Sequence, residues 1–315
     1  MDDVLAIVAP GQGAQAPGFL APWLTSPGFA RRLAWYSAVT GLDLVHYGTE
    51  ADADTIRDTA IAQPLLVAAA LATAHELVEG PTLPAGTVVA GHSVGEIAAA
   101  ALAGAFSVES ALVLVRERGR AMAEASAARP TSMTAVVGGD RDEVLGAIET
   151  CGLTAANNNG PGQIVAAGTV EQLERLAANP PARARLIPLS VAGAFHTEHM
   201  RPAVEHLRVL AMSVPTSAVA TTLLSNRDGA VVSDGGEYLE RIVNQVANPV
   251  RWDLCMSALL DHGVTGMLEL APAGTLTGIA RRQMKGVETF NLNTPDQLEA
   301  AREFVARHTT PVPAQ

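Results

Sequence analysis

The chain has 315 residues, of which 48% are hydrophobic and 17% charged, so it can bury a large core in one or two domains. Its net charge of −11 argues against nucleic acid as a partner, because phosphate binding needs an excess of basic side chains. Each apolar run is interrupted by Gly, His, Glu or Arg before it could span a bilayer, so we expect no membrane segment.

The N-terminus and the cysteines predict a cytoplasmic protein. Met1, Asp2 and Asp3 do not form the basic region with which a signal peptide begins. Cys151 and Cys255 stand far apart and in no metal-binding or redox spacing, which is typical of reduced structural thiols. We therefore expect no bound metal.

The first strand is expected at 5–9, an apolar run that leads into a glycine-containing loop at 10–15. Loops at the carboxyl ends of buried strands are where α/β folds bind ligands. No Gly-Lys-Ser or Gly-Lys-Thr follows, which excludes a phosphate-binding P-loop. A plain turn is an equally good interpretation of this loop by itself. Helices are expected next, at 29–39 and from near Asp54 to Leu77.

A strand, a sharp turn and an alanine-rich helix are predicted around residues 91–95, Gly-His-Ser-Val-Gly. In this context Gly-x-Ser-x-Gly forms a nucleophile elbow, with Ser93 at the apex of a strained turn. Gly91 and Gly95 would allow the close packing that such a turn needs. The alternative is an ordinary serine in a glycine-rich turn.

A helix is expected to begin after Ser107, which has the character of an N-terminal cap. Arg116, Arg118 and Arg120 lie along this helix. Most arginines on such a helix are solvated surface charges, so the pattern alone assigns a role to none of them.

From Arg129 onward the predicted elements follow the order strand, helix, strand, strand, helix, strand. The strands are expected at 134–137, 153–156, 163–167 and 185–189, and the helices at 142–150 and 170–178. This is the order of a ferredoxin-like module, and the Asn-rich turn at 157–162 suits its central hairpin. We predict a small domain at 129–195 that is inserted into a larger α/β domain at 1–128 and 196–315.

The chain then returns to the larger domain, with a helix expected to follow His196 and to end near residue 212. His196 is at the seam between the two predicted domains, where it would face a cleft. A surface histidine is the alternative if no serine needs a base. The remaining helices are expected at 238–246, 252–260, 275–284 and 295–308, and the remaining strands at 223–226, 266–270 and 289–292.

Taken together, the motifs resemble the malonyl-CoA:acyl carrier protein transacylase family, the acyltransferases of fatty acid synthesis. The resemblance extends from Pro10 to about Thr289. The motifs that carry it are PGQGAQ at 10–15, QP at 63–64, GHSVGE at 91–96, RG at 118–119, NGPGQ at 159–163, AFH at 194–196, QVANPVRW at 245–252 and TLTG at 275–278.

The resemblance implies an α/β-hydrolase-like large domain with a ferredoxin-like insert, and it implies residue roles. Ser93 would be the nucleophile and His196 its general base. The backbone N–H groups of Gln12 and Val94 would form the oxyanion hole. Arg118 would bind the malonyl carboxylate.

Four further positions follow from the same resemblance. A backbone carbonyl at Gln245 would orient the histidine in place of a triad Asp. Phe195 is the form found in malonyl-specific members, where a serine would suggest methylmalonyl. His92 is expected at the substrate site, and Arg185 matches a basic position associated with CoA or carrier-protein contacts.

The function implied is ping-pong transfer of a malonyl group from malonyl-CoA to the phosphopantetheine thiol of acyl carrier protein, without cofactor or metal. We expect a cytoplasmic monomer that binds no nucleic acid and no membrane. Because acyl carrier proteins are acidic and this chain is too, we hypothesise a local docking patch of basic residues. The patch would comprise Arg185, Arg281, Arg282 and Lys285.

Three alternatives remain open. A trans-acting polyketide acyltransferase would share the chemistry and differ only in its carrier. A serine thioesterase or esterase would use the same elbow, but it usually has a Ser…Asp…His order and no use for a buried arginine. A carrier-docking module without activity should show a broken elbow or a missing base, and both are intact in this sequence.

Overall fold

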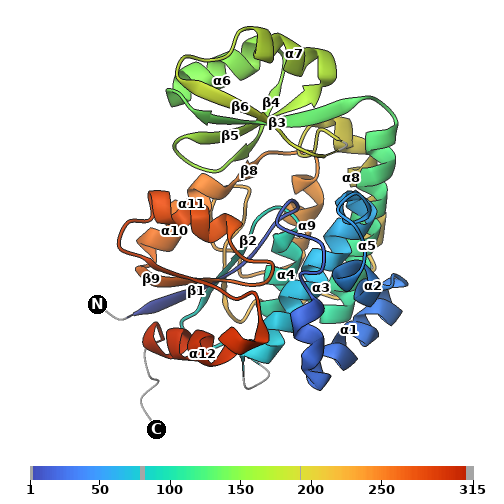
Figure 1. Ribbon diagram of the computed structural model, residues 1–315, viewed down its shortest axis with the longest axis vertical. Coiled ribbons are helices and arrows are strands. Elements are labelled where there is room, and N and C mark those ends of the chain that lie inside the picture. The colour runs from blue at the N-terminus through green and yellow to red at the C-terminus, as the bar shows by residue number, and fades with distance from the viewer. Residues whose placement is uncertain (1–2, 79–81, 192, 310–315) are drawn as a thin grey trace.

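The computed structural model describes residues 3–78, 82–191 and 193–309, and these residues form two lobes (Figure 1). Within the described residues the strands make up two five-stranded sheets, one in each lobe. Met1 and Asp2, which entered the expectation about a signal peptide, lie outside the described residues.

The sheet of the larger lobe is parallel throughout, in the order β10-β9-β1-β2-β7. Its strands are β1 (Val4–Ala9), β2 (Val88–Gly91), β7 (Thr222–Leu223), β9 (Val264–Glu269) and β10 (Glu288–Asn291). The central strand β1 is a continuous apolar run because both faces of the sheet are covered. The register pairs Ala9 with Gly91, so the loops that follow β1 and β2 leave the sheet side by side.

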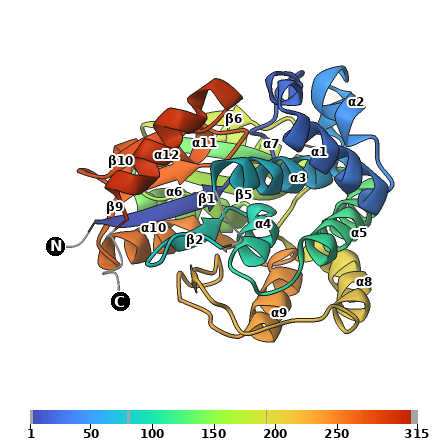
Figure 2. The same ribbon diagram turned by 90° about the horizontal axis from the view of Figure 1, so that it is seen from below.

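Helices cover both faces of this sheet (Figure 2). Leu5 and Ile7 point into the core on the side of α3 (Thr59–Leu77), whereas Ala6 and Val8 point into the core on the side of α10 (Trp252–Asp261) and α11 (Thr275–Gln283). The other helices of this lobe are α1 (Pro27–Thr40), α2 (Leu44–Thr49), α4 (Gly95–Leu102), α5 (Val108–Ala127), α8 (Arg201–Ala211), α9 (Gly235–Gln245) and α12 (Leu298–Arg307).

The expectation that no apolar run is long enough to cross a bilayer is wrong for α3. This helix is long and apolar enough by length and composition, but 78% of the relevant window is buried inside the protein. Its neighbours are α5, α1 and α4, so its apolar surface is covered by protein. Its composition is that of a core helix buried on all sides.

Two predicted helices begin later than the sequence indicates. The helix expected from near Asp54 is a short 3₁₀ turn, Thr55–Arg57, and α3 begins only after Asp58. Asp58 has a non-helical backbone conformation, with ψ at 125°, and its carboxylate caps the new helix by accepting a hydrogen bond from the Ala60 N–H at 2.8 Å. Similarly, another 3₁₀ turn, Glu198–Met200, separates His196 from α8.

The smaller lobe has the predicted ferredoxin-like topology. Its elements are β3 (Thr131–Gly138), α6 (Arg141–Thr150), β4 (Thr154–Asn158), β5 (Gln163–Thr169), α7 (Val170–Ala178) and β6 (Ala184–Pro188). The strand order β6-β3-β5-β4, with antiparallel pairs, is that of the ferredoxin-like module. This part of the fold prediction is confirmed.

One strand of the smaller sheet comes from outside the predicted insert. β8 (Val250–Arg251) follows α9 and pairs in parallel with β4. The pairing of Asn157 with Val250 gives the smaller sheet its fifth strand and joins the two lobes through backbone hydrogen bonds. A two-residue strand has no periodicity to detect, so the sequence does not predict it.

The turn between β2 and α4 depends on two glycines. A Cβ atom on Gly91 would overlap the carbonyl group of Gly95, and a Cβ atom on Gly95 would overlap the carbonyl oxygen of Ala9. The neighbouring atoms belong to the backbone, so no side-chain movement could relieve either overlap. The strand and helix can therefore approach this closely only without side chains at both positions.

We expect Gly91→Ala to lower the free energy of unfolding by about 3 kcal/mol or more, because the added methyl group must displace backbone. Urea unfolding followed by circular dichroism measures this. The matched control is Gly146→Ala in α6, where a Cβ atom meets nothing within 4 Å. The control should be neutral or slightly stabilising, and an unchanged midpoint for Gly91→Ala would contradict the expectation.

Candidate active site

Ser93 lies at the apex of the turn between β2 and α4, as the motif predicts. Its φ angle is +53°, a left-handed conformation that is rare for a residue with a side chain. The conformation is held by Asn226, whose side-chain oxygen accepts from the Ser93 N–H at 2.8 Å and whose amide nitrogen donates to the Gly91 carbonyl at 2.8 Å. The hydroxyl of Ser93 is thereby presented at the carboxyl edge of the sheet.

His196 stands opposite this hydroxyl, with its Nε2 atom 2.7 Å from Ser93 Oγ. Its other ring nitrogen, Nδ1, is 2.8 Å from the backbone carbonyl oxygen of Gln245. Because a carbonyl can only accept, Nδ1 carries the proton and Nε2 is free to accept from the serine. The sequence resemblance placed a carbonyl at this position, and the structure has it there.

The His196 ring is buried and stays neutral. Burial, followed by the positive charge of Arg118, lowers the pKa of its imidazole to about 3, although the hydrogen bond to the Gln245 carbonyl opposes the shift. The residue also has a positive φ angle of 61°, and its N–H donates to the Val246 carbonyl at 3.1 Å. A neutral, oriented imidazole is the form that can accept a serine proton.

The backbone N–H groups of Gln12 and Val94 have no acceptor among the described residues of the chain. Val94 caps the N-terminus of α4, where the helix dipole favours negative charge. Gln12 belongs to the loop after β1, whose neighbours Gly11 and Gly13 line the same cavity as Ser93. Two unpaired donors beside a nucleophile are the arrangement of an oxyanion hole.

Arg118 is fully buried on α5. Its Nη1 donates to Gln63 Oε1 at 2.6 Å and its Nη2 donates to Gln245 Oε1 at 2.9 Å, while its Nε has no acceptor among the described residues. Burial lowers the pKa of its guanidinium to about 10, although the nearby Glu96 raises it. The side chain therefore keeps its positive charge at neutral pH and is held by neutral amides.

Glu96 and Asn226 belong to this site, although the sequence analysis assigned a role to neither. The Glu96 carboxylate is buried and accepts from the Asn226 N–H at 2.5 Å, the Tyr238 hydroxyl at 3.2 Å and Gln245 Nε2 at 2.6 Å. Burial raises its pKa to about 7, and these donors together with Arg118 oppose the shift. The sequence signal that could have pointed to Glu96 is a glutamate in the first turn of an alanine-rich helix.

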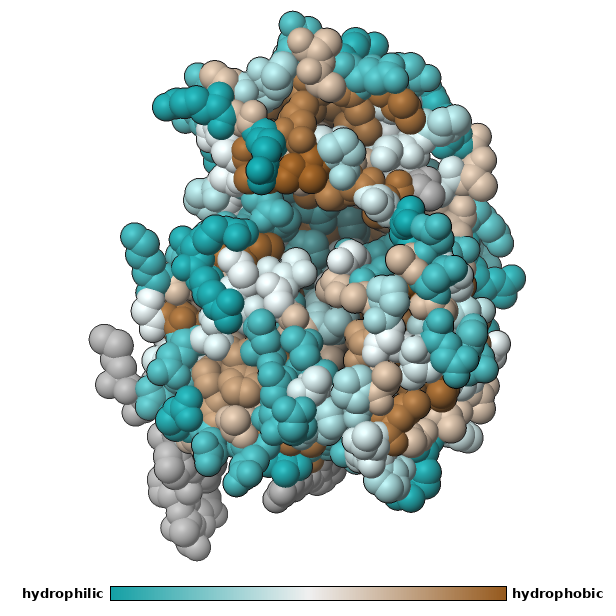
Figure 3. Space-filling view, viewed as in Figure 1, coloured by the Kyte–Doolittle hydropathy of each residue, from teal (hydrophilic) through white to brown (hydrophobic). Residues whose placement is uncertain are grey.

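Ser93 and His196 open into a cavity of about 230 Å³ between the lobes. The larger lobe contributes polar groups such as Gln63 and His92, whereas the smaller lobe contributes an apolar wall that includes Met133 and Val165. In Figure 3, hydrophobic side chains gather on the upper lobe directly above the hollow between the lobes. The cavity therefore combines reactive polar groups on one side with an apolar surface on the other.

His92 and Phe195 also line this cavity. The Nε2 atom of His92 lies 2.9 Å from Asn159 Oδ1, and the His92 ring packs edge-on against Trp252. His92 thus connects the nucleophile turn to the hairpin turn of the smaller lobe. Phe195 is nearly buried, at 6% exposure, directly before the base.

Arg185 does not line the cavity and lies exposed on the edge strand β6. The registers of β6, β3 and β5 place it in the same row as Gln163, whose side chain accepts from Arg282 at 3.3 Å. Arg185 and Arg282 are therefore at the same end of the smaller sheet. Arg281 donates to Thr289 Oγ1 at 2.9 Å on the neighbouring surface.

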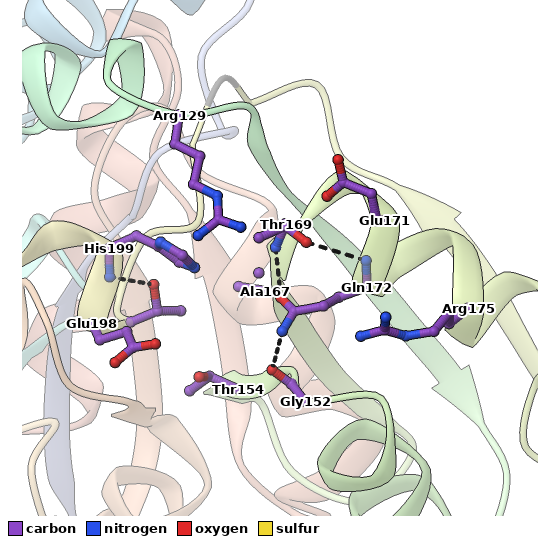
Figure 4. A pocket seen from close by; sticks show the side chains of 12 residues that line it. Arg129, Gly152, Thr154, Ala167, Thr169, Glu171, Gln172, Arg175, Glu198 and His199 are labelled. Atoms are coloured by element: carbon purple, nitrogen blue, oxygen red, sulfur yellow. Dashed lines mark hydrogen bonds between the residues drawn. The ribbon is translucent and has the colours of Figure 1, made fainter.

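A second cavity, of about 370 Å³, lies between α7 and the 3₁₀ turn that precedes α8 (Figure 4). Arg129, Arg175 and His199 line it together with Glu171 and Glu198. None of the predicted site residues lines it, and the mixture of positive and negative side chains selects no ligand charge. Across 3–78, 82–191 and 193–309, no cluster of His, Cys, Asp and Glu could hold a metal ion.

The sequence and the fold of the chain have close counterparts among known proteins. A model of the acyl transferase domain matches residues 7–302 of the chain. The malonyl CoA-acyl carrier protein transacylase of Mycobacterium bovis is 48% identical over 297 residues, which cover 94% of this chain and 98% of that protein.

Two solved structures agree with the fold. The crystal structure of MCAT from Mycobacterium tuberculosis has a TM-score of 0.90 at 47% identity and covers 95% of this chain and 99% of its own. A malonyl-transacylase in complex with a type II PKS acyl-carrier protein has a TM-score of 0.86 at 30% identity and covers 95% and 99%. Since the matches include both lobes and nearly the whole sequence, the chain belongs to the acyl transferase domain family.

Proposed function

We propose that the protein transfers the malonyl group of malonyl-CoA to the phosphopantetheine thiol of acyl carrier protein through an acyl-serine intermediate. One observation carries this proposal: a fully buried, charged Arg118 donates to the side chain of Gln245, whose backbone carbonyl orients His196, and forms no salt bridge among the described residues. A buried guanidinium with no carboxylate in direct contact suits a substrate that brings its own carboxylate. The names of the relatives support the same choice.

The first half of the reaction loads the serine. His196 Nε2 takes the proton of Ser93 Oγ as this oxygen attacks the thioester carbon of malonyl-CoA. The carbonyl oxygen becomes an oxyanion, which the N–H groups of Gln12 and Val94 stabilise, each by about 3 kcal/mol in comparable sites. The C–S bond then breaks, and the CoA sulfur leaves with the proton from His196.

The second half reverses these steps with a different thiol. His196 takes the proton of the phosphopantetheine thiol, the sulfur attacks the malonyl-serine ester, and the serine leaves with that proton. The malonyl carboxylate would reach Arg118 by replacing the Gln63 amide oxygen at Nη1. A carboxylate is the stronger acceptor for a guanidinium, so the exchange favours acids over neutral acyl groups.

A trans-acting polyketide acyltransferase is the second candidate. The similarity to a malonyl-transacylase solved with a type II PKS acyl-carrier protein favours it, and the site chemistry is the same for both. The two functions differ only in the carrier. We place carrier docking at the basic end of the smaller sheet, where Arg185 and Arg282 lie.

Intact-protein mass spectrometry tests the proposal directly. After brief mixing with malonyl-CoA, the wild-type protein should carry one malonyl group on Ser93, and a chase with holo acyl carrier protein should move it to the carrier. Ser93→Ala should form no adduct, whereas Ser257→Ala on the exposed surface of α10 should behave like wild type. An adduct that decays to malonate without reaching the carrier would favour a thioesterase.

Arg118→Ala should lower kcat/KM for malonyl-CoA on the order of 100-fold, because truncation removes a buried charge that the carboxylate pairs with. The use of acetyl-CoA should be retained or increased. Arg120→Ala is the control, since Arg120 is on the same helix with a side chain 59% exposed. Unchanged malonyl preference in Arg118→Ala would show that another group binds the carboxylate.

The low pKa of His196 predicts an unusual pH profile. Because the base is active when neutral, modification of Ser93 by a neutral sulfonyl fluoride should keep its rate from about pH 7.5 down to about pH 5. An unperturbed histidine, with a pKa near 6.5, would lose roughly tenfold per pH unit below that value. Because the pKa of Glu96 is about 7, the result that would contradict the assignment is an acidic limb near pH 6.5 that remains in Glu96→Gln, with the protein still folded.

A further inference from the structure

The Glu96 carboxylate accepts three hydrogen bonds, from a backbone N–H, a hydroxyl and a side-chain amide. Oε1 accepts from the Asn226 N–H at 2.5 Å and the Tyr238 hydroxyl at 3.2 Å, and Oε2 accepts from Gln245 Nε2 at 2.6 Å. The side chain is 1% exposed, so water does not compete for these donors. The two N–H donors favour the ionised carboxylate, whereas the single Tyr238 hydroxyl proton is shared with the Leu224 carbonyl oxygen at 3.0 Å. Above its pKa of about 7 the Glu96 carboxylate is ionised.

The Gln245 amide lies between this carboxylate and Arg118. Its Nε2 donates to Glu96 Oε2 at 2.6 Å, and its Oε1 accepts from Arg118 Nη2 at 2.9 Å. A guanidinium only donates and a carboxylate only accepts, so one orientation of the amide satisfies both neighbours. Arg118 requires the carbonyl oxygen of the amide on its side, and the Glu96 carboxylate fixes the amide in that orientation by accepting from its Nε2.

The same carboxylate compensates the charge of the arginine. No Asp or Glu in the described parts of the chain forms a salt bridge with Arg118, and Glu96 is the group whose charge raises the Arg118 pKa against burial. A buried cation that loses its compensating anion is strongly destabilised. The position of the guanidinium therefore depends on a residue that it does not touch.

We propose that Glu96 is a positioning residue for acyl-carboxylate recognition. Through the Gln245 amide it holds Arg118 in place, and so it sets the preference for acyl thioesters that carry a carboxylate over neutral ones. This inference rests on the proposed function, because it names how the same site selects its acyl group. It predicts an effect on selectivity that a purely structural role for Glu96 would not produce.

The test compares acylation of Ser93 by malonyl-CoA and by acetyl-CoA, measured as kcat/KM by mass spectrometry, in wild type and Glu96→Gln. In the variant a neutral amide replaces the carboxylate, so the charge that compensates Arg118 is lost and Gln245 Nε2 donates to a weaker acceptor. The malonyl-to-acetyl ratio should fall at least about tenfold, mainly through the malonyl-CoA value. Acetyl-CoA should change by less than about threefold.

Tyr238→Phe is the matched control, since it removes one hydrogen bond from the same carboxylate and leaves the Gln245 contact intact. It should lower the unfolding midpoint without changing the ratio. Gln245→Met is the second variant, because it removes the connecting amide but keeps the backbone carbonyl that orients His196. It should lower the malonyl-to-acetyl ratio as Glu96→Gln does. If Glu96→Gln does not fold, the ratio in Gln245→Met tests the connection between Glu96 and Arg118.

Three results would overturn the inference. The first is a malonyl-to-acetyl ratio that stays at the wild-type value in Glu96→Gln or in Gln245→Met, the two variants that remove the Glu96–Gln245–Arg118 connection. The second is an equal loss with both substrates in Glu96→Gln, which would place the effect on the nucleophile turn through Asn226. The third is a fall of the ratio in Tyr238→Phe equal to that in Glu96→Gln. Failure of the proposed function is distinct, since the wild-type protein would then form no malonyl adduct.

Discussion

The burial of one positive charge is the constraint on which the site depends. Arg118 is 0% exposed, so its hydrogen-bonding partners must come from the protein, and the amides of Gln63 and Gln245 supply them from α3 and α9. The backbone carbonyl of Gln245 also orients His196. A single residue at the end of α9 therefore holds both the charge that selects the acyl group and the base that activates the nucleophile, and this links recognition to reaction.

The two lobes contribute different properties to the cavity between them. The carboxyl edge of the parallel sheet supplies the nucleophile and N–H donors that have no acceptor in the described part of the chain, and this edge is where open α/β sheets place their ligands. The smaller sheet supplies apolar side chains, which favour an acyl group that is shielded from water. The pairing of β8 with β4 and the contact between His92 and Asn159 hold the lobes together, so the apolar wall stays opposite the nucleophile.

Much of the fold could be predicted because the relevant signals are local. A buried apolar strand, an alanine-rich helix and glycines at fixed spacing each leave a pattern within about ten residues, and so do the alternating elements of the smaller lobe. The predictions were wrong where a local sequence pattern is compatible with two different structures. An aspartate inside an expected helix became the cap of a later one at Asp58, and the apolar composition of α3 reflects the core of the larger lobe.

The sequence by itself determined most of the elements, the elbow around Ser93 and, through motif resemblance, most of the residues expected at the site. Only the tertiary structure decided how these residues are held. Asn226 reaches the nucleophile turn across 133 positions and Gln245 reaches Glu96 across 149, and no spacing along the chain records such contacts. The physical reason is that hydrogen bonds between buried groups depend on which surfaces the folded sheet and helices bring together, and a carboxylate has three donors around it only once α4, α9 and the β7 loop have packed.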